Sequence, residues 1–351
     1  MGKAALLLVL GLGLAFAVIG QNLHKTGSMT AEFQTGYLKY ATARNLARTA
    51  VHARLRLIES TGENKKGRVD GSFNRGTYYT EVDSLGPDSL RMNAWSTFED
   101  SVYRMRLTLQ SYPKPFPGVS AAIGIRAAPV AFSMSGAGAE VNGNNHNEDG
   151  SAMVGTGHVP GVATLNKADS TTVYNAGLDN QGVQRIKGSP SAVTVNPNTP
   201  NPAQFISEYM DAADSIYTTS SIAGNRTFGG PNNPMIIVCD SPADTNYKVK
   251  FTGNVTGYGI LAIRGNLEIG GTFNWYGLVI VFGESNTVTF GGSGTPGIVG
   301  GLIIAQPGDG AASLTLKGTG NQGKVLYSSA ALEKAKKIPK LTYYRVVDWY
   351  E

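Results

Sequence analysis

The N-terminus contains the feature that most limits how this chain can fold. Residues Ala4 to Leu23 carry no charged side chain, whereas Lys3 precedes them and Lys25 follows shortly after. Twenty helical residues at ~1.5 Å each can cross a hydrocarbon layer of ~30 Å. A cleaved secretory signal has a shorter apolar core and a small-residue cleavage site. We therefore predict a membrane-inserted helix, and a simple membrane anchor stays open as an alternative.

The helical pattern continues beyond the apolar run. Between Phe33 and Ile58, apolar and small residues recur at spacings of three and four, and no proline occurs before Pro87. We predict one helix over residues 1–60 that serves for membrane insertion and for assembly. The residues expected to pack in the assembly are Leu6, Leu7, Leu8, Val9, Leu10, Leu12, Leu14, Phe16, Val18, Ile19, Phe33, Tyr37 and Tyr40.

The positive charge of the chain lies in its first third. Residues 1–110 hold 14 Lys and Arg against 9 Asp and Glu, so they contain the whole net charge of +5. A basic patch directly after an apolar span favours a position near a membrane over binding to nucleic acid, and we expect no nucleic-acid partner. This basic stem is expected to pair with acids of neighbouring copies or with anionic headgroups. It comprises Lys39, Arg44, Arg48, Arg54 and Arg56.

A β-meander is predicted over residues 61–115. Residues 77–82, 89–95 and 103–109 each alternate in side-chain character, which is typical of strands. The segment Leu85-Gly86-Pro87-Asp88 between the first two is a turn signal.

Residues 116–351 are predicted to form a parallel β-helix. Residues 266–271, 287–292 and 313–318 are near-repeats, and a second series interleaves with them at 260–263, 278–281, 302–305 and 324–327. The 45 glycines, about 13% of the chain against a usual ~7%, fit the sharp corners of such coils. A β-sandwich is the alternative fold, and a helix is predicted near 203–216. The overall class is thus α+β, mainly β.

Three stretches of the sequence resemble type IV pilin-like proteins with a PilX-type N-terminus and a large β-helical C-terminal region. They are GKAALLLVLGLGLAF followed by ATARNLARTAVHARL, the meander GTYYTEV, SLRMNAWS and YRMRLTL, and the glycine-rich GYGILAIRGNLEIGGTFNWYGLVIVFG. One feature departs from the family, whose mature chains have an early glutamate. Here that position is Ala5, or Leu7 after cleavage behind Gly2.

The resemblance implies a structural subunit of a bacterial surface filament. Its partners would be copies of itself in a helical filament, the pilus assembly machinery, and the inner membrane before assembly. The missing acid leaves apolar helix packing as the assembly force. A surface or glycan ligand of the β-helix is open.

Other candidate motifs lack the context that their chemistry needs. Gly318–Lys324 has the glycine spacing of a phosphate loop, but Val325 stands where Ser or Thr is required. Asn145, Asn147 and Asp149 form a weak calcium candidate, because Thr156 replaces the bidentate acid. We expect no cofactor and no catalytic residue.

Two alternative functions stay open. One is a membrane-anchored β-helix adhesin or carbohydrate-active enzyme, for which Glu268, Glu284 and Arg264 are the candidate cluster. The other is a minor or tip pseudopilin of a secretion system.

Overall fold

The computed structural model describes residues 2–61, 66–155, 157–244, 246–283, 286–291, 296–318 and 323–351. The chain forms two compact units: an N-terminal unit of residues 1–112 and 343–351, and an inserted unit of residues 113–342. The sequence-based division placed residues 343–351 in the C-terminal region, whereas the structure groups them with the N-terminal helix and meander.

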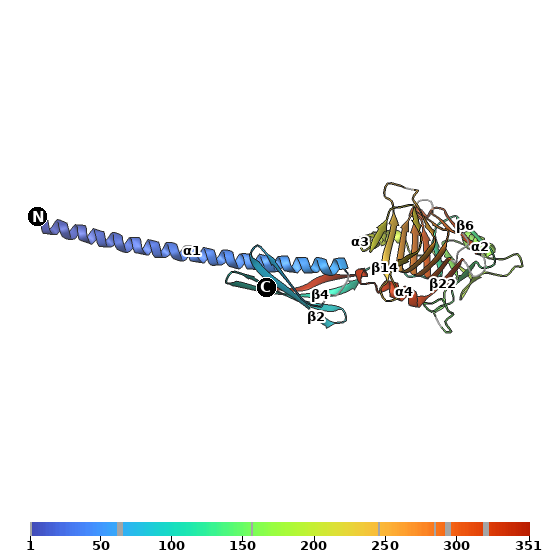
Figure 1. Cartoon of the computed structure of the whole chain (residues 1–351), viewed down its shortest axis with the longest axis horizontal. Coiled ribbons are helices and arrows are strands. Elements are labelled where there is room, and N and C mark those ends of the chain that lie inside the picture. The colour runs from blue at the N-terminus through green and yellow to red at the C-terminus, as the bar shows by residue number, and fades with distance from the viewer. Residues whose placement is uncertain are drawn as a thin grey trace. The chain divides into compact units, whose positions relative to one another are not determined.

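A single helix, α1 (Gly2–Thr61), begins the N-terminal unit. It runs without a break through Gly11, Gly13, Gly20, Gly27 and Gly36, none of which has a neighbouring atom where a side chain would begin. Figure 1 shows that the strands of this unit lie beside the later part of α1 and leave its N-terminal part free. The predicted helix over residues 1–60 thus matches α1 closely.

A five-stranded sheet in the order β1-β2-β3-β4-β23 completes the N-terminal unit. The pairs β1–β2, β2–β3 and β3–β4 are antiparallel. All three predicted meander strands are present, each longer than its pattern indicated. The strand bounds are β1 (Gly67–Phe73), β2 (Gly76–Gly86), β3 (Ser89–Phe98), β4 (Ser101–Pro113) and β23 (Thr342–Tyr350).

The core of this unit lies between the sheet and the later part of α1. Side chains of β3 and β4 alternate between buried and exposed, so one face of each strand packs inward. Met92 of β3 and Leu107 of β4 are fully buried there with Val51 of α1.

The inserted unit contains two larger sheets, and every described strand pair in them is parallel. This differs from the mainly antiparallel pairing of a Greek-key sandwich, the alternative fold. One sheet consists of β5 (Ile123–Arg126), β7 (Glu140–Asn142), β8 (Val162–Thr164), β9 (Ile186–Lys187), β10 (Val193–Val195), β11 (Ser215–Tyr217), β13 (Arg226–Phe228), β14 (Met235–Asp240), β16 (Asn254–Arg264), β18 (Thr272–Phe282), β20 (Pro296–Ala305) and β22 (Lys324–Tyr327). The other consists of β6 (Val130–Ser135), β12 (Ser221–Ala223), β15 (Lys248–Thr252), β17 (Asn266–Ile269), β19 (Asn286–Phe290) and β21 (Ala312–Lys317).

Consecutive strands from β15 to β22 alternate between these two sheets. The first predicted repeat series is in register, because Leu267 pairs with Val288 and Val288 with Leu314. The second series is only partly in register. Leu278 pairs with Gly301 instead of Leu302, and residues 324–327 pair with residues 297–300, which precede 302–305 in β20.

A column of glycines crosses the long strands of the larger sheet. Gly259, Gly277 and Gly300 pair in register, and their φ angles of +113°, +135° and +144° belong to a region that favours glycine. A Cβ at Gly300 would lie 1.9 Å from the carbonyl oxygen of Gly277. Glycine at these three positions therefore permits the close stacking of successive strands.

Short helices accompany the sheets: α2 (Lys167–Ala176), α3 (Ile206–Asp211), α4 (Ser329–Lys336) and the 3-10 turns η1 (Pro202–Gln204), η2 (Pro307–Asp309) and η3 (Pro339–Leu341). The helix predicted near 203–216 is shorter than expected. It ends at Asp211. Asp214 already exchanges hydrogen bonds with Ile236 through its backbone N–H and its carboxylate, and Ile216 belongs to a strand beside Val238.

Candidate assembly site

The first part of α1 is an uncovered apolar surface. Every residue from Leu8 to Leu38 is exposed, and α1 is long and apolar enough to cross a membrane. We call residues Leu8–Leu23 the apolar segment. The predicted assembly residues whose side chains are described are all at least 49% exposed: Leu8, Val9, Leu10, Leu12, Leu14, Phe16, Val18, Ile19, Phe33, Tyr37 and Tyr40. The side chains of Leu6 and Leu7 lie outside the described part.

The later part of α1 packs on the sheet of its own unit. Ala43, Ala47 and Val51 are fully buried, and the small alanines let the helix backbone approach the strands. The Ser96 hydroxyl in β3 donates a buried 2.6 Å hydrogen bond to the carbonyl oxygen of Ala43. The predicted helical stripe therefore divides near residue 42 into an exposed part and a packed part.

Lys39 stands at the boundary between these two parts of the helix. Its ammonium group lies 2.9 Å from the Glu99 carboxylate and 3.0 Å from that of Asp100, in the turn between β3 and β4. Hydrogen bonds to Glu99 and Asp100 raise the pKa of Lys39, and the bond from Lys39 lowers the pKa of Asp100.

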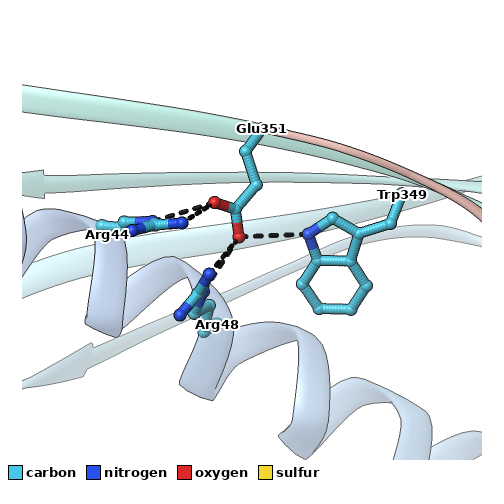
Figure 2. Close-up of polar contacts among 4 residues, drawn as sticks. All are labelled: Arg44, Arg48, Trp349 and Glu351. Carbon is cyan, nitrogen blue, oxygen red and sulfur yellow. Dashed lines mark hydrogen bonds and ion pairs between the residues drawn. The ribbon is translucent and has the colours of Figure 1, made fainter.

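Two further cations of α1 hold the end of β23. Arg44 and Arg48 both hydrogen-bond the side-chain carboxylate of Glu351, and Nε1 of Trp349 donates to the same carboxylate at 3.1 Å (Figure 2). Burial alone would raise the pKa of Glu351, but hydrogen bonds from Arg48, Arg44 and Trp349 outweigh it and lower the pKa to about 2. The group therefore stays ionised at neutral pH. We call this arrangement the Glu351 clamp.

The last two residues of the basic stem differ from each other. Arg54 is 2% exposed and donates from Nη2 to the carbonyl oxygen of Gly67 at 3.3 Å, and burial lowers its pKa. Arg56 is exposed. The expectation that the basic stem pairs with neighbouring copies or headgroups stays a prediction. Lys39, Arg44 and Arg48 pair with acids of their own chain, which the folded meander and β23 bring beside the helix.

The calcium candidate is not assembled around a common point. Asp149 accepts hydrogen bonds from the backbone and the hydroxyl of Ser151, and Asn147 also donates to that hydroxyl. Asn145 instead exchanges hydrogen bonds with Ser329 at the start of α4. Thr156 is outside the described residues. Within the described ranges, no three His, Cys, Asp or Glu side chains are grouped to hold a metal ion.

The two described members of the candidate carbohydrate-active cluster, Glu268 and Arg264, form ion pairs with other residues. Glu268 forms ion pairs of 2.6 Å with Lys248 and with Lys250. Arg264 instead lies 3.5 Å from Asp240. Glu284 is not among the described residues, and neither are residues 319–322 of the glycine-rich loop before Lys324.

Comparisons with known proteins include one weak structural match of interest. No protein-family model matches the sequence, and no curated protein matches it. Among solved structures, the chain is similar to the crystal structure of the competence-associated pilin ComZ from Thermus thermophilus. The two are 12% identical, the match covers 89% of this chain and 97% of that chain, and the TM-score is 0.26. A TM-score this low supports no conclusion about fold or function, so the proposed function depends on the residues of this chain alone.

Proposed function

We propose that this protein is a structural, non-catalytic subunit of a bacterial surface filament, of the type IV pilin-like kind. The proposal is supported mainly by the difference between the two parts of α1. Its later part is packed on a sheet, whereas its apolar segment is long, uncharged and without contacts in the monomer. Water disfavours such a surface by ~25 cal/mol per Å² of apolar area, so the segment requires either lipid or copies of itself.

The basic stem supports the filament proposal over a simple anchor. An anchor requires only the membrane-spanning residues, whereas here the helix continues for several turns and is tied to the sheet by Lys39 and the Glu351 clamp. Together with the buried packing of the later part of α1, these ties hold the helix on its sheet, and so set the direction in which the apolar segment leaves it. A fixed direction suits a helical lattice, in which every copy must present its segment in the same way.

The inserted unit is proposed to be a parallel β-helix that faces outward from the filament. The support is the alternation of consecutive strands between two parallel sheets and the in-register stacking of residues such as Leu267, Val288 and Leu314. Its role would be display or adhesion at the cell surface. Before assembly, the apolar segment would lie in the inner membrane, from which the pilus assembly machinery would extract the subunit.

Electron microscopy of the purified full-length chain, after removal of detergent, tests this function. We expect filaments of uniform diameter. Dispersed monomers with saccharide-cleaving activity would contradict the proposal and favour the membrane-anchored enzyme. Monomers that join only the end of another pilin's filaments would instead favour a minor or tip subunit.

A further inference from the structure

One edge of the N-terminal sheet has an apolar face that α1 does not cover. Val69 and Phe73 of β1 are 39% and 58% exposed. Both lie on the face of the sheet that carries α1, because their partners in β2 are Thr80, which is buried, and Gly76, which lies under Leu46 of the helix. The opposite face of β1 is charged, with an ion pair between Arg68 and Asp70.

The space beside α1 has the form of a shelf. Its floor is the Tyr78 ring, which lies over Gly71 so closely that a Cβ there would be 2.4 Å from the ring. On its inner side the surface is bounded by α1, where Arg54 donates to the carbonyl oxygen of Gly67 at the start of β1, and Leu46, Ala50 and Arg54 are themselves buried. The outer rim is Val69 and Phe73. We call this surface the β1 shelf.

Dimensions explain why the shelf is uncovered. A helix with its side chains is ~10–12 Å wide, and three neighbouring strands spaced ~4.8 Å apart span about 10 Å, so one helix covers about three strands. The backbone of α1 lies against β2 and β3, and the inward side chains of β4 are also buried, which leaves β1 as the uncovered strand. A second helix placed 8–10 Å from α1 would lie over β1.

We propose that the β1 shelf receives the apolar segment of a second copy of this chain. This inference rests on the proposed filament function and names the surface on which the segment docks. The apolar segment matches this surface because it is helical, uncharged from Leu8 to Leu23 and uncovered in the monomer. Each copy carries one segment and one shelf in different places, so the contact is head-to-tail, the kind of contact that builds an open helical filament when its rotation does not close a ring.

Chemical crosslinking tests the docking directly, because the chain has a single cysteine. Cys239 is fully buried, and burial raises the pKa of its thiol, so it does not compete. Full-length Phe73→Cys is mixed with Leu10→Cys, Leu14→Cys or Phe16→Cys before detergent is removed, and a short bismaleimide is added. We expect a crosslinked dimer with at least one segment position.

The matched control is Val102→Cys. Val102 is 53% exposed, close to the exposure of Phe73, but it lies on the opposite face of the sheet, since its neighbour Tyr103 is buried toward α1. It should give no segment crosslink. Equal crosslinking of both positions, or filaments without any crosslink to Phe73→Cys, would overturn the β1 shelf while the filament function stands. Failure of the wild-type chain to assemble would overturn both.

A second pair of variants tests the shelf without crosslinking. Phe73→Asp should raise the protein concentration needed for filaments at least tenfold, whereas Val102→Asp should leave it unchanged. Both residues are exposed in the monomer, so both monomers should unfold at the wild-type temperature. Equal assembly by the two variants would refute the proposal.

Discussion

Replacing Phe16 by alanine tests how much each apolar side chain contributes to assembly. Phe16 is 68% exposed in the monomer. Burying a whole phenylalanine side chain is worth ~1.5–3 kcal/mol, so burying the exposed two thirds is worth about 1–2 kcal/mol. Since 1.4 kcal/mol is a factor of ten in an equilibrium constant, the critical concentration for assembly should rise about 5- to 30-fold.

The assay is sedimentation of filaments over a series of protein concentrations after detergent removal. The control is Val154→Ala, which removes a fully exposed valine of the inserted unit and should leave the critical concentration unchanged. Phe16→Ala should also leave the unfolding temperature unchanged, because the side chain is mostly exposed in the monomer. An unchanged critical concentration would show that the segment is not buried on assembly, and the reasoning would fail.

Three further predictions concern the monomer. Glu351→Gln should lower the melting temperature of the N-terminal unit at pH 7 and make that temperature depend less on pH in acid. The folded pKa of about 2 lies below the unfolded value of ~4.3, so the carboxylate stabilises the fold above about pH 4.3, and this contribution is lost as the pH falls toward 2. If the melting temperature of the variant fell with pH as it does in the wild type, the Glu351 clamp would be contradicted. Leu107→Ala should lower the free energy of unfolding of the same unit by ~2–5 kcal/mol in urea titration, because the side chain is fully buried, and a loss under 1 kcal/mol would contradict the described core. Gly300→Ala should lower the melting temperature of the inserted unit, because Gly300 has a positive φ and no room for a Cβ. Gly297 has no positive φ, and a Cβ there would make only ordinary contacts from 3.5 Å, so Gly297→Ala should leave the melting temperature nearly unchanged. A larger loss with Gly297→Ala than with Gly300→Ala would refute the role of the glycine column.

Local patterns in the sequence predicted the helix and the meander because each depends on nearby residues. The uncharged run and the three-and-four spacing are sufficient to indicate α1, and alternation is sufficient to indicate β2, β3 and β4. The first edge strand was missed, because Gly67 and Gly71 resemble a polar turn. Only pairing with β2 makes it a strand.

Long-range pairing is where the sequence alone was insufficient. The Glu351 clamp joins residues more than 300 positions apart, and nothing near Arg44 or Arg48 indicates which acid they bind. One signal was available: residues 343–350 are rich in aromatic and β-branched residues, as strands are. Propensity does not say which sheet such a strand joins, so it was assigned to the inserted region. For the same reason, similarity between the repeats aligned Leu278 with Leu302, whereas the strands pair Leu278 with Gly301, one residue earlier.

The central claim is that the apolar segment leaves water by packing on other copies. It is tested most directly by measuring maleimide labelling of Leu14→Cys in the assembled state and in denaturant. Leu14 is 66% exposed in the monomer, and Cys239 is buried. We predict rapid labelling in denaturant and strong protection in assembled protein, with Val154→Cys labelled rapidly in both. Equal, rapid labelling of Leu14→Cys and Val154→Cys in sedimented filaments would contradict the account.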